Sequence, residues 1–283
     1  KYIFKVFLWY NKSKIESMGV FMNILFIGDI SGRTGRRAIF EKLYDIKAKY
    51  AADFVIANGE NSSGGSGITK KVYEELQRAG IDVFTLGNHA FSKKEVFTLF
   101  SEGENVIRPA NLPEGTPGCG MNIFYAKNKA KVAVINLIGQ LYMDKPEGIT
   151  NPFLVVDELI GKAKEKTNII IVDMHAEATS EKEAMGWNLD GKVSAVIGTH
   201  THVQTADETI LPKGTAYITD VGMTGAQDSI LGVKIEPALN KFLQKVPARF
   251  EIAGGKTKFC AVVLNIDEAT GKALAIERIY LKD

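Results

Sequence analysis

Side chains that can bind metal ions stand directly after several apolar runs of this sequence. All four histidines take part, together with two carboxylates and two asparagines: Asp29, Glu60, Asn61, Asn88, His89, His175, His200 and His202. Mixed oxygen and nitrogen donors favour manganese, iron or zinc over calcium and magnesium, which prefer all-oxygen shells. The set exceeds what one ion with an open coordination position needs. Two ions that share one carboxylate fit the number better, and such a pair can clamp an in-line phosphoryl displacement.

The elements that must position these residues alternate between strand and helix from Asn23 onward. Short apolar runs that end in glycine or a polar residue predict five buried strands: "NILFIGD", "DFVIANGEN", "IDVFTLGNH", "NIIIVDMH" and "VSAVIGTHTH". Ligand groups in open α/β sheets gather outside the carboxyl ends of the strands. The five strand ends therefore predict one shared site in an α/β fold.

Helical spacing and capping residues predict helices between these strands. We expect Thr34, Thr69 and Ser92 to open three of them, and two further helices to span 153–166 and 179–191. The runs "MNIFYA" and "KVAVINLIG" predict paired strands, and "MTGAQD" predicts a glycine-containing loop. The terminal runs "KFCAVVLNID" and "KALAIERIYL" predict a hairpin that forms antiparallel edges of the sheet.

The spacing of "GTHTH" leaves two geometries open for His200 and His202. Residues two apart on an extended strand face the same side, whereas on a curved loop they can point at two different ions. Each polar residue also has a structural interpretation: a lone histidine often only packs, and Asp29 can cap a turn. Asn61 and Asn88 can be turn residues beside glycine. The joint occurrence of all of them at strand ends favours the metal hypothesis.

Composition restricts the class of protein. A net charge of +2 gives no electrostatic basis for stable nucleic-acid binding. Cys119 and Cys260 have no metal-site or disulfide spacing, so we expect reduced thiols and a cytoplasmic protein. The apolar run near the start is short and broken by Lys5, which fits neither a signal peptide nor a membrane span. We expect an N-terminal extension, residues 1–21, and one domain, residues 22–283, that does not enter a membrane.

Longer motifs give a resemblance to a known family. "GD" after the first strand, "GEN", "GNH", an isolated histidine and "GTHTH" occur in the order of the calcineurin-like metallophosphoesterase superfamily. The strings "GDISGRTGR", "ANGENSSGGSGIT", "RPANLPEGTPG", "HAEATSEKEAMGW", "GTHTHVQTAD" and "AYITDVGMTG" resemble its YmdB-like cyclic-nucleotide phosphodiesterase family of bacteria. Ser31 stands where the superfamily has the histidine of D-x-H, and Glu60-Asn61 stands where it has a bridging aspartate. Both departures are typical of the YmdB-like subgroup.

The resemblance implies a four-layer αββα sandwich of the metallophosphoesterase type and two iron or manganese ions. It implies that Glu60 bridges them, and that the other ligands are Asp29, Asn61 and His202 for one ion and Asn88, His175 and His200 for the second. His89 is then the general acid that protonates the leaving oxygen, and a metal-bridging water is the nucleophile. The implied substrates are small cyclic nucleotides, 2′,3′- or 3′,5′-cyclic, and the implied assembly is a homo-oligomer.

Three other functions fit parts of the sequence. Gly28, Gly32 and Gly35 follow a strand and precede a helix, as phosphate-binding glycines do in dinucleotide-binding enzymes. Their spacing is not G-x-G-x-x-G, and this hypothesis gives the histidines no task. A phosphomonoesterase or protein phosphatase would use the same metal centre, and spacing does not separate it from a phosphodiesterase. A regulatory or interaction protein would keep the metals but act by binding and not by catalysis, and His89 would then lack its implied role.

Overall fold

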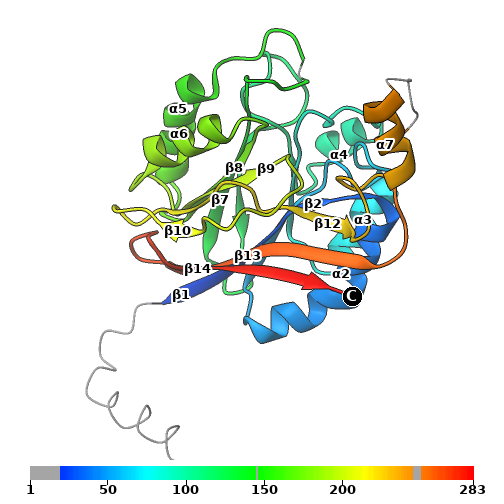
Figure 1. The fold of residues 1–283 in the computed structure, drawn as a ribbon. Coiled ribbons are helices and arrows are strands. Elements are labelled where there is room, and N and C mark those ends of the chain that lie inside the picture. The colour runs from blue at the N-terminus through cyan, green and yellow to red at the C-terminus, as the bar shows by residue number, and fades with distance from the viewer. Residues whose placement is uncertain (1–19, 145, 245–249) are drawn as a thin grey trace, which may run out of the picture.

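Two β-sheets carry the fold, and helices flank them (Figure 1). The structure is a computed structural model and describes residues 20–144, 146–244 and 250–283. The predicted extension, residues 1–21, falls almost entirely on residues 1–19, which lie outside the described residues.

The first sheet has eight strands in the order β2-β12-β13-β1-β3-β4-β5, with β14 paired to β13. Its strands are β1 (Phe21–Ile27), β2 (Asp29–Ile30), β3 (Phe54–Asn58), β4 (Val83–Thr85), β5 (Val106–Ile107), β12 (Met223–Ala226), β13 (Thr257–Asp267) and β14 (Ala273–Lys282). Strands β1, β3, β4 and β5 run parallel, so their carboxyl ends lie at one edge.

The second sheet has six strands in the order β10-β11-β9-β8-β7-β6. Its strands are β6 (Met121–Tyr125), β7 (Lys131–Ile138), β8 (Ile170–His175), β9 (Ala195–Thr199), β10 (Thr209–Ile210) and β11 (Ala216–Ile218). The central strands β7, β8, β9 and β11 are parallel. The predicted pairing of β6 with β7 is confirmed, and it is antiparallel.

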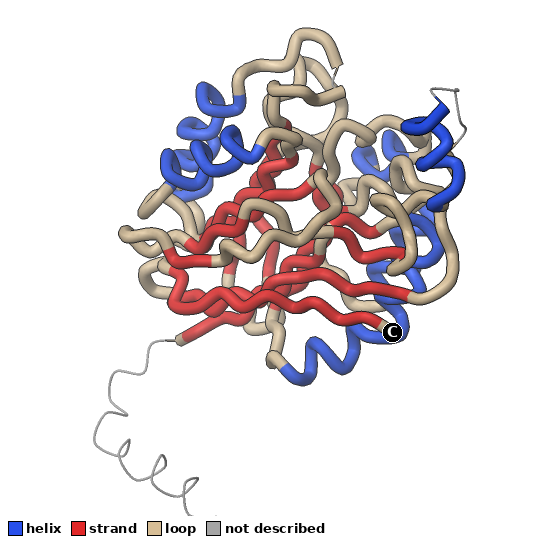
Figure 2. The backbone as a smooth tube through the Cα atoms, viewed as in Figure 1, coloured by secondary structure: helices blue, strands red, loops and turns tan. Residues whose placement is uncertain are grey.

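Six helices are described: α2 (Gly32–Lys49), α3 (Lys70–Arg78), α4 (Val96–Ser101), α5 (Pro152–Lys164), α6 (Thr179–Leu189) and α7 (Ile235–Gln244). The helices lie around the outside of the strands (Figure 2). Three apolar clusters show how these elements pack. In one cluster, Phe26 and Ile56 of the first sheet meet Val134 and Ile171 of the second. A second cluster joins α2 and α3 to the first sheet, and a third joins α5 and α6 to the second. The two sheets therefore share a buried apolar contact.

Two predicted helix starts are wrong. Helix α2 begins at Gly32 with Ser31 as N-cap. Thr34 lies inside the helix, where its hydroxyl donates to the carbonyl of Ala253 at 2.9 Å. Helix α4 follows Glu95, and Ser92 lies in the preceding turn. The third cap is confirmed, since Thr69 accepts a hydrogen bond from the Val72 amide at 3.3 Å.

Two features of the first sheet also differ from the prediction. The segment predicted as a loop, "MTGAQD", contains β12, which pairs with β2 and β13. The predicted hairpin of β13 and β14 is confirmed, but only β14 lies at the edge, since β13 also pairs with β1. Eight of the eleven residues of β13 are buried, which suits a strand with neighbours on both sides.

Both cysteines are free thiols, as predicted; Cys119 is exposed and Cys260 is buried. No helix within the described residues combines the length and the apolar character that crossing a bilayer requires.

Candidate metal centre

The side chains predicted at strand ends meet where β3 and β4 of the first sheet approach β8 and β9 of the second. The ring nitrogen Nε2 of His175 lies 3.1 Å from each of three atoms: Oε1 of Glu60, Oδ1 of Asn88 and Nδ1 of His200. Glu60, His175 and His200 each offer a ligand atom within 4.8 Å of the others. We call the set of Glu60, Asn88, His175 and His200 the inner group. They derive from four different strand ends.

A second group adjoins the first and consists of Asp29, Asn61 and His202; we call it the outer group. Nε2 of His202 lies 3.7 Å from Oδ1 of Asp29 and 3.2 Å from Nδ2 of Asn61. Nδ2 of Asn61 is also 3.3 Å from Oε1 of Glu60, so Glu60 links the inner group to the outer group. A half-turn of the Asn61 amide would exchange its nitrogen for its oxygen at this place.

The backbone of "GTHTH" decides how the two histidines are directed. Strand β9 ends at Thr199, and both His200 (φ 100°) and His202 (φ 64°) have left-handed backbone conformations. Such conformations cost non-glycine residues roughly 1–3 kcal/mol each and persist only where surrounding contacts hold them. The segment is therefore a curved loop, and it directs His200 into the inner group and His202 into the outer group.

Hydrogen bonds on the far side of each imidazole fix which nitrogen carries the proton. Nδ1 of His175 lies 2.8 Å from the Thr199 hydroxyl, which itself donates to Oδ1 of Asp173 at 2.7 Å. Because the hydroxyl hydrogen is used on Asp173, the Thr199 oxygen accepts from Nδ1–H of His175. This arrangement leaves Nε2 directed into the inner group, where it can hold a proton or bind a metal ion.

The other two imidazoles follow the same rule. Nδ1 of His202 lies 3.0 Å from the carbonyl oxygen of Leu231, which can only accept, so Nε2 holds the lone pair. Nε2 of His200 lies 3.2 Å from a Glu177 carboxylate oxygen, which leaves the Nδ1 lone pair. Two imidazole lone pairs and Nε2 of His175 thus face inward together with buried carboxylate oxygens. Donors this close need a positive charge among them, so the donor set fits metal ions.

Electrostatics within the cluster favour a positive charge between Glu60 and His175. Burial alone would raise the pKa of Glu60, but the charge and hydrogen bond of His175 lower it to about 2. Burial would lower the pKa of His175, but Glu60 raises it to about 9, so without a metal ion a proton occupies the Nε2 position that a metal ion would take. Burial also raises the pKa of Asp29, whose Oδ1 is buried without a hydrogen-bond partner among the described residues. An unpartnered carboxylate oxygen of this kind is costly unless a cation binds it.

Close packing at Gly87 explains why the sequence has "GNH" at the end of β4. A side-chain carbon at this position would lie 2.2 Å from the His175 ring and 2.4 Å from the Glu60 carboxylate. Only glycine therefore lets the chain pass beneath the inner group and present Asn88 and His89 beyond it.

His89 is close to the cluster but stands apart from its convergent atoms. Its backbone N–H donates to Oε2 of Glu60 at 3.0 Å, while its ring nitrogen Nε2 lies 3.5 Å from the Asn88 amide nitrogen. The His89 side chain lines an open hollow of about 240 Å³, the metal-site hollow, whose wall also includes Glu177 and Leu231. The ring is thus available to a molecule in that hollow.

A buried ion pair beneath the loop was not predicted from the sequence. Nζ of Lys182 lies 2.9 Å from Oδ2 of Asp220, and both side chains are at most 1% exposed. Lys182 also donates to the Thr199 carbonyl at 3.3 Å, and Asp220 accepts from the amide (3.0 Å) and hydroxyl (2.7 Å) of Thr201. Thr201 is the residue between His200 and His202. The Lys182–Asp220 pair therefore holds the loop that carries both histidines.

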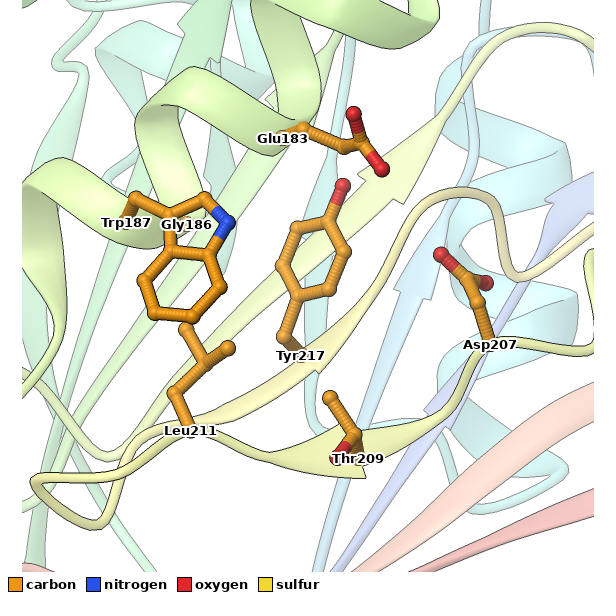
Figure 3. A pocket seen from close by; sticks show the side chains of 7 residues that line it. All are labelled: Glu183, Gly186, Trp187, Asp207, Thr209, Leu211 and Tyr217. Atoms are coloured by element: carbon orange, nitrogen blue, oxygen red, sulfur yellow. The ribbon is translucent and has the colours of Figure 1, made fainter.

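A separate hollow of about 210 Å³ lies between α6 and strands β10 and β11 (Figure 3). Its wall combines two aromatic rings, Trp187 and Tyr217, with the carboxylates of Glu183 and Asp207. None of the predicted site residues lines it, so this hollow is not part of the candidate metal centre.

Fold and cluster together define the class: an α/β protein with a mixed nitrogen and oxygen centre where two sheets meet at their strand ends. The model of the YmdB-like protein family matches residues 25–279, and the chain belongs to this family. The family predicted from the sequence is confirmed.

Known proteins resemble the chain over nearly its whole length. A Bacillus subtilis protein, named 2′,3′-cyclic-nucleotide 2′-phosphodiesterase, is 51% identical over 93% of this chain and 98% of its own. The crystal structure of a hypothetical protein from Thermus thermophilus is 44% identical with a TM-score of 0.85, covering 93% of this chain and 100% of the other. A structure described as a novel phosphatase from Mycoplasma pneumoniae is 38% identical with a TM-score of 0.87, covering 94% and 95%.

Proposed function

We propose that this chain is a metal-dependent phosphodiesterase that hydrolyses cyclic nucleotides, with 2′,3′-cyclic nucleotides as the first candidates. One observation carries the metal dependence: three imidazole nitrogens and buried carboxylate oxygens face one another, and the outer hydrogen bonds of the imidazoles support that orientation. The substrate class rests on the name of the Bacillus subtilis relative.

The two groups suggest how two ions, iron or manganese, would be held. The inner group would bind one ion through Asn88, His175 and His200, and the outer group would bind the other through Asp29, Asn61 and His202. Glu60, which lies within 3.3 Å of atoms in both groups, would bridge them. Imidazole and carboxylate ligands together suit these metals better than calcium or magnesium.

When bound, the ions would supply Lewis-acid polarisation of the phosphate and would lower the pKa of the attacking water. The residues of this chain supply the remaining parts of the reaction. His89 lines the metal-site hollow, and its backbone bond to Glu60 holds it beside the centre. It would donate a proton to the oxygen that leaves phosphorus. The shielding of Glu60 and Asp29 from water strengthens every charge interaction at the site.

We also propose that the two sheets and their outer helices form the four-layer αββα sandwich of metallophosphoesterases, and that residues 22–283 are one domain. The three apolar clusters support this order, because one joins the sheets and the others join each sheet to its own helices.

A comparison of ester classes tests the function. The purified chain, stripped of metal by a chelator and reloaded with manganese, should hydrolyse 2′,3′-cyclic AMP far faster than the monoester p-nitrophenyl phosphate. The stripped protein should be inactive on both. Faster hydrolysis of the monoester would instead support the phosphatase alternative, and full activity of the stripped protein would refute metal dependence.

A further inference from the structure

An apolar hollow of about 300 Å³ lies between α4 and the loop "RPANLPEGTPG", and its wall is made of aromatic rings and prolines. Its lining includes Phe91, Phe97, Leu112, Pro113, Thr116 and Pro117. The rings of Phe91 and Phe97 stack with centroids 5.5 Å apart, and Phe97 is 43% exposed. We call this the aromatic–proline hollow. A partly exposed ring in an apolar wall offers a flat surface to a flat ligand.

The proline side of this hollow is rigidly built. The guanidinium of Arg108 donates to three backbone carbonyls, those of Pro109 (2.7 Å), Thr116 (3.0 Å) and Pro117 (3.1 Å). Arg108 is 9% exposed, so these bonds are shielded from water. The loop "RPANLPEGTPG" is therefore a fixed wall, and a preformed pocket binds a ligand with little ordering cost.

Two independent connections run from lining residues of this hollow to lining residues of the metal-site hollow. Phe91 follows His89 by only two residues, within one turn closed by the bond from the Ser92 amide to the His89 carbonyl (3.0 Å). On the other side, Leu112 packs in one cluster with Met143, whose sulfur accepts from the Glu177 amide at 3.1 Å. His89 and Glu177 both line the metal-site hollow. These connections bring Phe91 and Leu112 of one hollow close to His89 and Glu177 of the other, and no described residue lines both hollows.

We propose that the aromatic–proline hollow is the base subsite, in which the nucleobase packs against Phe91 and Phe97 while its cyclic phosphate lies at the metal centre. This inference rests on the proposed function. Because the lining is almost entirely apolar, recognition would depend on ring contact rather than on hydrogen bonds to base edges. Such contact accepts any base, since every base has a π face. The enzyme would accordingly hydrolyse purine and pyrimidine cyclic nucleotides alike.

A pair of substrates tests the base subsite. The probes are 2′,3′-cyclic AMP and methyl β-ribofuranoside 2,3-cyclic phosphate, which has the same sugar and cyclic phosphate but no base. Phe97→Ala should raise KM for the cyclic nucleotide about 5- to 150-fold, the usual worth of one base–aromatic contact. Its kcat, and both constants for the base-free diester, should stay within twofold. Phe40→Ala, which removes an exposed ring on α2, is the matched control and should change neither substrate.

A binding measurement separates this inference from folding effects and from turnover. In a His89→Ala background, calorimetric affinity for 2′,3′-cyclic AMP should fall by the same factor when Phe97→Ala is added. Equal KM changes for both probes, or no change for either, would overturn the base subsite while leaving the proposed function intact. If the unmodified chain hydrolyses neither probe, the proposed function itself fails and the base subsite fails with it.

Discussion

Glu60 is the residue through which the inner and outer groups meet. Its Oε1 lies 3.1 Å from Nε2 of His175 and 3.3 Å from Nδ2 of Asn61, and its Oε2 accepts a hydrogen bond from the backbone N–H of His89. A neutral amide of the same size would keep the packing but lose the negative charge that both groups share. Replacing Glu60 by glutamine should therefore weaken metal binding although the two side chains have nearly the same volume.

We predict that Glu60→Gln loses both metal ions and activity while the protein stays folded. The measurement is metal content by elemental analysis, with circular dichroism as the check on folding. Glu41→Gln, which neutralises an exposed carboxylate on α2, is the control and should keep both ions. Two ions retained in Glu60→Gln would show that Glu60 is not the bridge.

His89 should behave differently, because it lines the metal-site hollow and its ring is not among the convergent donor atoms. We predict that His89→Ala keeps its metal and lowers kcat by about 10²–10⁴-fold, the usual contribution of a general acid. Ser92→Ala, an exposed residue in the same turn, should retain full activity. Unchanged turnover in His89→Ala would remove the acid role.

At this scale the sequence predicts ligand types but not the groups that hold them. Asp29, Glu60 and His175 could be chosen as candidates because metal-type side chains directly after apolar runs are unusual, and the structure brings them into one cluster. Lys182 could not, since a lysine in a helix is an ordinary surface residue until its burial is known. Asp220 follows an apolar run as Asp29 does, but the sequence does not show that its partner is a buried lysine. Their contact spans 38 residues, and nothing in local spacing predicts it.

At the scale of elements, the Gly198–His202 loop depends on α6 for its shape. Lys182 lies on α6, and through Asp220 it fixes Thr201 between the two left-handed histidines. Breaking a buried ion pair on one side leaves an uncompensated charge and commonly costs about 3–5 kcal/mol. The loop would then relax toward ordinary backbone conformations and misdirect the imidazoles.

We predict that Lys182→Met lowers the melting temperature and weakens manganese binding about 10- to 100-fold, the range found for residues that orient metal ligands. Lys192→Met is the matched control, because Lys192 forms an exposed pair with Asp157 (2.9 Å) worth at most about 1 kcal/mol. Equilibrium dialysis on the folded variants gives the affinities. A Lys182→Met protein that binds manganese normally would show that the pair supports the fold without orienting the loop.

Element boundaries could be predicted only where a local signal decides them. Thr69 caps α3 as expected. The N-cap of α2 is Ser31 and not Thr34, whose hydroxyl donates to the distant Ala253 carbonyl. Strand β12 was missed because its "MTGA" has little strand propensity, and pairing with β2 and β13 supplies its structure.

At the scale of the whole molecule, the candidate centre ties the two sheets together. Glu60 and Asn88 follow strands of the first sheet, whereas His175 and His200 belong to strand ends of the second. The sequence predicts the strands and their ends but not the order of the sheets, because the pairing of β1 with β13 joins residues about 240 positions apart. Such long-range pairing is set by the packed molecule and has no local pattern.

We predict that metal binding stabilises the folded protein, since the ligands converge only when both sheets are assembled. An ion at 100 times its dissociation constant should add about 2.7 kcal/mol to the free energy of unfolding. Thermal melting with manganese and with a chelator measures this difference. Glu60→Gln should melt at the same temperature in both conditions, and an unmodified protein that does the same would refute the coupling.

The most direct test of the central claim is the number of metal ions per chain in freshly purified protein, measured by elemental analysis against protein concentration. A shared Glu60 between the inner and outer groups predicts two ions, iron or manganese, in each active chain. A protein that hydrolyses cyclic phosphodiesters at full rate with no bound metal, or with a single ion, would contradict the account.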